Sequence, residues 1–231
     1  MQQEDRMMDF KEILQFSWSV LKLNMSFLVG VTVTYIILAI VPQVYYAIYE
    51  PASPGLVDSL ISLLFTIIRI WLGVAVIKIC ILAVENRLQG LVDFLVPVRT
   101  ILYFVLTNIL AAVIIFIGLI LLIFPGIYIA IRLQFAGYFV IEGIENPIDA
   151  LKESYAATED LTMELFLIML VFLFIAIVGF LLLGVGLIIA YPLIMLATAT
   201  IFKSLQAGQD YIPSPPYTVE SLMNSEPGNF D

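Results

Sequence analysis

The sequence predicts an all-α integral membrane protein with about six transmembrane helices, arranged as three hairpins that are each preceded by a short cytoplasmic amphipathic helix. The first observation is composition: of 231 residues, 62% are hydrophobic and 13% are charged. A soluble domain is typically about 45–50% apolar and about 25% charged. A soluble fold of this size could not bury so much apolar surface, so the bilayer must act as part of the solvent.

The second observation is a set of charge-free runs that locate the spans, since about 20 apolar residues cross about 30 Å of hydrocarbon. The runs 100–131 and 165–202 are each too long for one helix. Turns are expected at Pro125-Gly126 and at Gly184-Val185-Gly186, because proline removes a backbone donor and glycine tolerates a reversed backbone. The predicted spans are about 25–48, 56–84, 101–123, 126–142, 165–183 and 187–203. An amphipathic segment, 1–24, precedes them, and a polar tail with several prolines, 204–231, follows them.

Amphipathic stretches lie before each predicted hairpin, at 9–23, 91–98 and 147–161. Each has an acidic residue near its start: Asp9, Asp93 and Asp149. Asn146-Pro147 is a strong helix start, with a capping side chain followed by proline at the first helical position. The pattern predicts three units of interfacial helix plus hairpin. The alternative is chance similarity, because amphipathic linkers are common between spans.

The third observation is the placement of lysine and arginine, which sets orientation in the membrane. In the six-span arrangement, seven of these residues flank the spans on the side of the termini, and none lies in the connections on the other side. Both termini are therefore expected in the cytoplasm. The seven are Arg6, Lys11, Lys22, Arg87, Arg99, Lys152 and Lys203.

Missing residue types exclude several chemistries. The chain has no histidine and one cysteine, Cys80, so imidazole ligation, Ser-His-Asp catalysis and an intrachain disulfide are excluded. No metal, cofactor or catalytic site is predicted, and net charge −9 argues against nucleic acid. The acid-rich stretch 142–164 fits a solvated face better than a metal loop or acid–base machinery.

Two arginines fall inside predicted spans and are the candidate binding residues. Arg69 lies near the middle of the second span, and Arg132 lies about six residues into the fourth. A cation at membrane depth is costly, so it faces protein, water or a headgroup. We expect a pocket for an anionic lipid headgroup or small anion. The alternatives are snorkelling, and binding to backbone carbonyls freed at Pro125-Gly126. Snorkelling is the expectation for Lys78, near the cytoplasmic end of its span.

A set of short motifs resembles a known family. The motifs are Phe124-Pro125-Gly126-Ile127-Tyr128, then Arg132, Glu142, Pro147, Ala150-Leu151 and Ser154, with Trp18, Lys22, Asn24 and Pro192 also fitting. They resemble the membrane domain attached to some bacterial glycerophosphodiester phosphodiesterases and the related YciC-like multi-pass proteins, over roughly residues 10–205. The resemblance implies a six-helix fold in the bacterial inner membrane. It does not imply phosphodiesterase activity, which belongs to a separate soluble barrel.

Three function classes remain open on the sequence. The first expectation is a non-catalytic accessory or scaffold subunit that binds other membrane proteins. The second is a lipid-handling or transport protein that uses Arg69 and Arg132. An enzyme is the third and least expected class, because no nucleophile and base stand in evident spacing.

Overall fold

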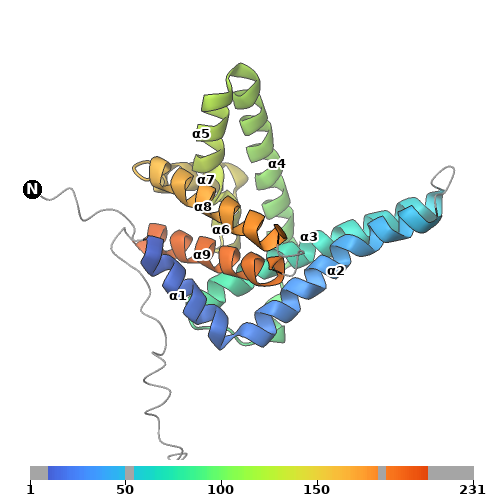
Figure 1. The fold of residues 1–231 in the computed structure, drawn as a ribbon. Helices are drawn as coiled ribbons and strands as arrows, with labels where there is room; N and C mark the ends of the chain where they lie inside the picture. The colour runs from blue at the N-terminus through green and yellow to red at the C-terminus, as the bar shows by residue number, and fades with distance from the viewer. Residues whose placement is uncertain (1–9, 50–54, 182–185, 208–231) are drawn as a thin grey trace, which may run out of the picture.

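The computed structural model describes residues 10–49, 55–181 and 186–207, and this part of the chain consists of helices joined by short connections (Figure 1). Six helical stretches within it are long and apolar enough to cross a membrane. The predicted all-α membrane fold is confirmed. The elements are α1 (Phe10–Leu23), α2 (Met25–Tyr49), α3 (Leu56–Val84), the 3-10 turn η1 (Leu91–Phe94), α4 (Val98–Leu121), α5 (Ile123–Leu133), α6 (Ala136–Ile141), α7 (Pro147–Ala157), α8 (Thr162–Leu181) and α9 (Leu187–Ala207).

The second hairpin turns earlier than the sequence predicted. The break lies at Leu122, whose extended backbone (φ −162°, ψ 142°) separates α4 from α5. Pro125 is the third residue of α5, where a helix has no intrahelical partner for its N–H groups, so the missing donor costs nothing. Gly126 lies inside α5, and its role is close approach: an added Cβ would stand 2.7 Å from the backbone nitrogen of Leu119. The prediction of a turn at Pro125-Gly126 is therefore wrong by three to four residues.

The two helices of the third hairpin also approach each other closely at glycine residues. Gly184 lies outside the described residues, whereas Gly186 directly precedes α9. An added Cβ at Gly186 would stand 2.8 Å from the Cα atom of Gly179 on α8. The two helices thus meet through glycines near the hairpin tip, as α4 and α5 meet through Gly118 and Gly126. Small residues permit this close contact between membrane helices.

Each hairpin has one mostly exposed helix and one that is about half buried in the protein. In the apolar windows of α2, α4 and α8, 17% of the residues are buried. The corresponding share is 50% in α3, 56% in the α5–α6 span and 56% in α9. The second helix of every hairpin therefore builds the core, and the first covers it. Figure 1 shows the α2–α3 and α4–α5 hairpins diverging from that shared centre.

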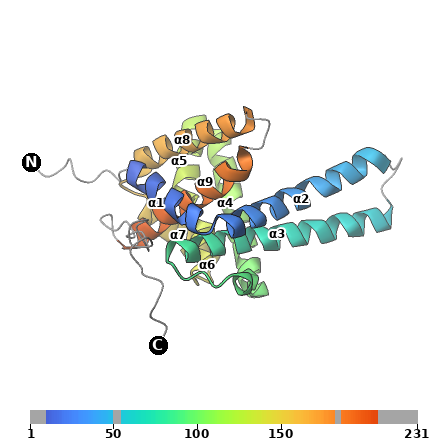
Figure 2. The same ribbon diagram turned by 60° about the horizontal axis from the view of Figure 1, so that its bottom comes forward.

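The three expected amphipathic helices form to different extents. α1 buries Ile13, Phe16, Ser17, Val20 and Leu21, and it packs on α9, where the Ser17 and Thr200 hydroxyl oxygens lie 3.3 Å apart (Figure 2). α7 begins at Pro147, and its cap is as predicted: the Asn146 side chain accepts a hydrogen bond from the Ile148 N–H at 3.1 Å.

The second amphipathic stretch is a single 3-10 turn, which corrects the prediction of a helix over 91–98. The turn ends at Phe94, since Leu95 is already extended (ψ 95°), and Pro97 disfavours helical backbone at Val96. Gly90 enters the turn with φ +95°. Asp93 holds the turn from within, since one of its carboxylate oxygens accepts N–H bonds from Gln89 (2.7 Å) and Gly90 (3.0 Å).

Candidate functional site

Arg132, one of the two candidates, is buried and hydrogen-bonded within the protein. Its side chain is 2% exposed. Nε and one terminal nitrogen donate to the carbonyl oxygen of Tyr155 at 3.2 and 2.7 Å, and the other terminal nitrogen donates to the Tyr128 hydroxyl. The guanidinium also stacks on the Tyr155 ring, 3.7 Å from its centroid. Because Tyr155 lies in the last turn of α7, Arg132 caps that helix end, where unpaired carbonyls favour a cation.

The neighbouring backbone is held by the same helix. The Ser154 hydroxyl donates to the carbonyl oxygen of Arg132 at 2.8 Å and accepts the Phe135 N–H at 3.2 Å. Ser154 thus bridges the interruption between α5 and α6. Ser154 is fully buried at this site. One alternative from the sequence was that Arg132 binds backbone carbonyls freed at Pro125-Gly126. Arg132 does bind a backbone carbonyl, but that carbonyl belongs to Tyr155 of α7 and not to the hairpin turn.

Arg69, the second candidate, is placed differently. It lies on α3, about 20 Å from the first residue of that helix at 1.5 Å per residue, and so near the middle of the 29-residue span. It is exposed on the protein surface. Within the described part of the chain, its guanidinium has no hydrogen bond or ion pair. A cation at this depth without a protein partner requires water or an anion.

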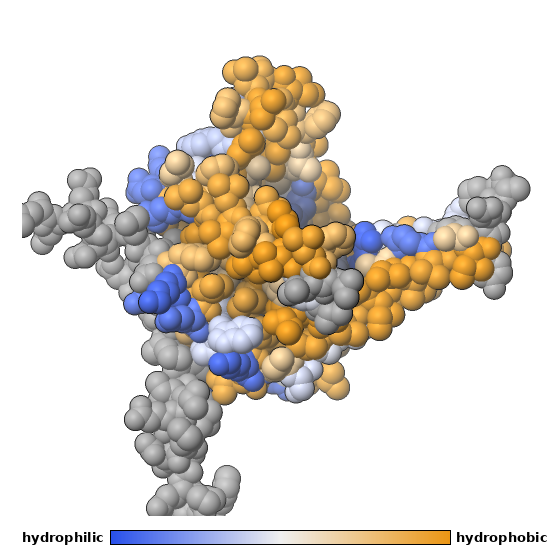
Figure 3. All heavy atoms as spheres, in the orientation of Figure 1, coloured by the Kyte–Doolittle hydropathy of each residue, from blue (hydrophilic) through white to orange (hydrophobic). Residues whose placement is uncertain are grey.

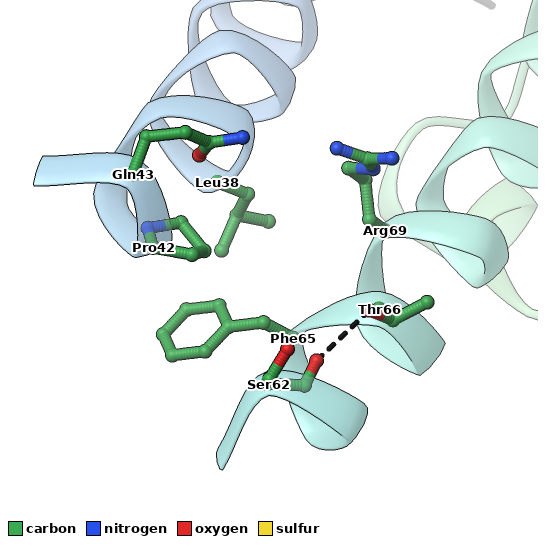
Figure 4. A pocket seen from close by; sticks show the side chains of 7 residues that line it. All are labelled: Leu38, Pro42, Gln43, Ser62, Phe65, Thr66 and Arg69. Atoms are coloured by element: carbon green, nitrogen blue, oxygen red, sulfur yellow. Dashed lines mark hydrogen bonds between the residues drawn. The ribbon is translucent and has the colours of Figure 1, made fainter. Parts of the chain in front are cut away.

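The outer pocket lies between α2 and α3 on the side of Arg69 nearer the hairpin tip, and has a volume of about 380 Å³. Figure 4 shows the Gln43 amide and the Arg69 guanidinium extending from the two helices, with the Phe65 ring directed from α3 towards Pro42 of α2. The Thr66 hydroxyl is used within its own helix, because it donates to the Ser62 carbonyl oxygen at 2.8 Å. The lining residues are Leu38, Pro42, Gln43, Ser62, Phe65, Thr66 and Arg69.

Pro42 interrupts the hydrogen bonding of the helix that forms this wall. It lies inside α2, so residue 42 cannot donate the helical hydrogen bond to the carbonyl oxygen of Leu38. Both residues line the outer pocket. The pocket therefore combines a cation, an amide and hydroxyl groups within a part of the hairpin that is otherwise apolar.

The inner pocket lies on the other side of Arg69 and has a volume of about 500 Å³. Its walls are mainly apolar side chains of α3, α4 and α9. Its other polar residues are Tyr35, Asn108 and Tyr191, and the two tyrosine rings stack with centroids 5.8 Å apart. Arg132 lines neither pocket. The structure therefore keeps Arg69 as a candidate binding residue and separates Arg132 from it.

An ion cluster that the sequence did not reveal joins the core helices. Lys203 of α9 contacts Glu85 at 2.6 Å and Glu142 at 2.9 Å, with its own side chain 11% exposed. Both glutamates are helix C-caps, followed by residues with positive φ: Asn86 (56°) and Gly143 (113°). The core helices of all three hairpins meet here. The sequence feature that could have indicated this cluster is a pair of similar helix ends, Glu85-Asn86 and Glu142-Gly143, which are far apart in the sequence.

Lys78 and Cys80, the other groups considered from the sequence, are bonded or buried within the protein. Lys78 donates to the carbonyl oxygen of Leu95 at 3.0 Å, in the connection that precedes α4. Cys80 is buried, with 1% of its surface exposed. Among residues 10–49, 55–181 and 186–207, no three His, Cys, Asp or Glu side chains gather in a group that could hold a metal ion. Comparisons with protein families, with curated proteins and with solved structures find no match to this chain.

Proposed function

We propose that this polytopic membrane protein binds an anionic amphiphile, with the headgroup at Arg69 and apolar parts against the inner pocket. The supporting observation is an exposed arginine at mid-span with no partner in the described chain, placed between two pockets. Arginine's planar fork of donors suits a phosphate or carboxylate group. The resemblance noted above and the lysine and arginine distribution support a bacterial inner membrane location with both termini cytoplasmic.

The chemistry of the walls supports a lipid over a small soluble anion. A free phosphate needs only donors, and the inner pocket offers mainly hydrocarbon surface. An amphiphile satisfies both parts, because its headgroup pairs with the cation while its chains remove apolar wall from water. No catalytic role is part of this proposal, since neither pocket contains a nucleophile paired with a general base.

The test is lipid analysis of the protein purified in mild detergent, by native mass spectrometry. Arg69→Gln is expected to weaken the affinity for anionic lipid about 10- to 100-fold, because a hydrogen bond to a charged group contributes about 1.5–3 kcal/mol. Arg69→Lys should retain part of the binding, since the charge remains but the fork is lost. Arg87→Gln is the matched control, because it removes the same charge at an exposed position, 3.4 Å from Glu85. Equal lipid content in all variants would refute the proposal.

A second candidate is an accessory subunit that packs against other membrane proteins. It is favoured by the α2–α3 hairpin, which extends beyond the core and exposes its apolar end: Ile48 is 71% exposed, Leu56 87% and Val57 68% (Figure 1). The same purification separates the two functions. Proteins recovered in fixed stoichiometry, together with unchanged recovery of Arg69→Gln, would favour the subunit.

A further inference from the structure

We propose that the two pockets are successive binding positions for one headgroup, and that the protein moves anionic phospholipid headgroups across the bilayer midplane. This inference rests on the proposed function and adds an activity to it. The observation behind it is that both pockets have Arg69 as a lining residue, one on each side of it along α3. A single binding site needs only one such cavity.

The two pockets together cover a long continuous stretch of α3. The outer pocket reaches along α3 from Ser62 to Arg69, and the inner pocket reaches from Arg69 to Ile77. The whole stretch is about 22 Å at 1.5 Å per residue, compared with about 30 Å of hydrocarbon. With α3 near the membrane normal, a headgroup that exchanged between the pockets would cross most of the apolar layer without leaving the protein surface.

Polar groups line α3 from its tip to the arginine. Ser59, Ser62, Thr66 and Arg69 follow each other at intervals of three or four residues, which places them on one helix face. Figure 3 shows hydrophilic atoms along an edge of the α2–α3 hairpin, beside a largely hydrophobic surface. Beyond Arg69 the inner pocket continues with Asn108. Such a path lowers the cost of carrying a charged headgroup through the membrane.

The inner pocket has exposed apolar walls, so the lipid chains need not enter the protein. Ile70 and Ile109 line the inner pocket and are 37% and 56% exposed. In a membrane these exposed surfaces face acyl chains, because the bilayer is the only apolar solvent present. A headgroup can then move within the protein while its tails remain in the lipid. Arg69 attracts the headgroup from either side and has no carboxylate in the described chain that would compete for it.

The experiment places the full chain in phosphatidylcholine vesicles that carry a trace of fluorescent NBD-phosphatidylglycerol, and adds dithionite outside. Without translocation, only the outer leaflet is bleached. The parent protein is expected to expose the inner-leaflet label as well. Arg69→Gln should slow this phase at least tenfold, whereas Arg87→Gln should match the parent. Bleaching that stops at the protein-free level with the parent protein would overturn the inference.

Asn108→Leu separates translocation from binding. The change keeps the number and branching of side-chain heavy atoms and removes a polar group of the inner pocket, while the outer-pocket residues stay unchanged. It should retain co-purified lipid and lose most of the translocation rate. If the parent binds lipid at Arg69 but does not translocate it, the inference fails and the proposed function stands. If the parent binds no anionic lipid, both fail.

A soluble dye, NBD-glucose, enclosed in the same vesicles distinguishes lipid from free anion. Dithionite is itself an anion, and it would bleach this dye if the path conducted small anions. The dye is expected to stay protected while the lipid label is lost. Bleaching of the enclosed dye would show that free anions cross, and lipid translocation would be overturned.

Discussion

Gly126 offers the sharpest test of how the second hairpin is packed. A Cβ atom added there would lie 2.5 Å from two side-chain carbons of Leu119 and 2.7 Å from its backbone nitrogen. Non-bonded carbons normally approach to about 3.5–4.0 Å. The Leu119 side chain can rotate away, but its backbone nitrogen can move only if α4 and α5 separate. We therefore assign Gly126→Ala an overpacking cost near the upper end of the usual range, about 3 kcal/mol.

Part of this destabilisation is offset, because alanine stabilises a helix interior relative to glycine by about 0.5–1 kcal/mol. The expected net loss of stability is about 2 kcal/mol. With the scaling of soluble domains of this size, the unfolding midpoint would fall by about 4–8 °C. The matched control is Gly30→Ala on α2, where an added Cβ meets no atom within 4 Å. This variant should be unchanged or slightly more stable.

Thermal unfolding of both variants in one detergent, followed by circular dichroism, provides the measurement. The contrast between the two glycines is the informative quantity, since both changes add the same methyl group to a membrane helix. Equal midpoints for the two alanine variants would refute the close contact between α4 and α5.

Three further perturbations test the core and the topology. Arg132→Met should lower stability by about 3 kcal/mol, because the carbonyl group it caps loses charged donors, and it should leave bound lipid unchanged; reduced lipid with normal stability would contradict the structural role. Lys203→Met should destabilise by about 1–3 kcal/mol, and adding Glu142→Gln should recover part of that loss by removing one of two facing carboxylates; strictly additive losses would argue against the cluster. A cysteine at position 52 should be labelled from outside the cell and one at position 215 should not; the reverse pattern would place the termini on the other side.

The spans could be predicted from the sequence because a bilayer imposes a one-dimensional rule. Apolar length decides where a helix crosses, and the prediction of 56–84 coincides with α3. Helix ends governed by local side chains were also predictable, as the Asn146 cap shows. Both features depend on residues that are close together in the chain.

The contacts that assign roles to the charged residues were not predictable, because they join distant segments. Arg132 pairs with a carbonyl group 23 positions away, and Lys203 meets glutamates from two other hairpins. Periodicity places a residue on a helix face but does not say which helix faces it. Gly126 shows a related limit: a glycine required for close approach and one required for a turn look the same in sequence.

The division of each hairpin into a lipid-covered first helix and a core-forming second helix has a consequence for biosynthesis. In the second and third hairpins the first helix is also the more apolar of the two. A ribosome delivers the chain from its N-terminus, so a strongly hydrophobic helix leaves the exit tunnel before its less hydrophobic partner. The translocon can release that first helix into lipid on its own hydrophobicity. Its partner, which carries the polar core residues, then enters beside a helix that is already anchored.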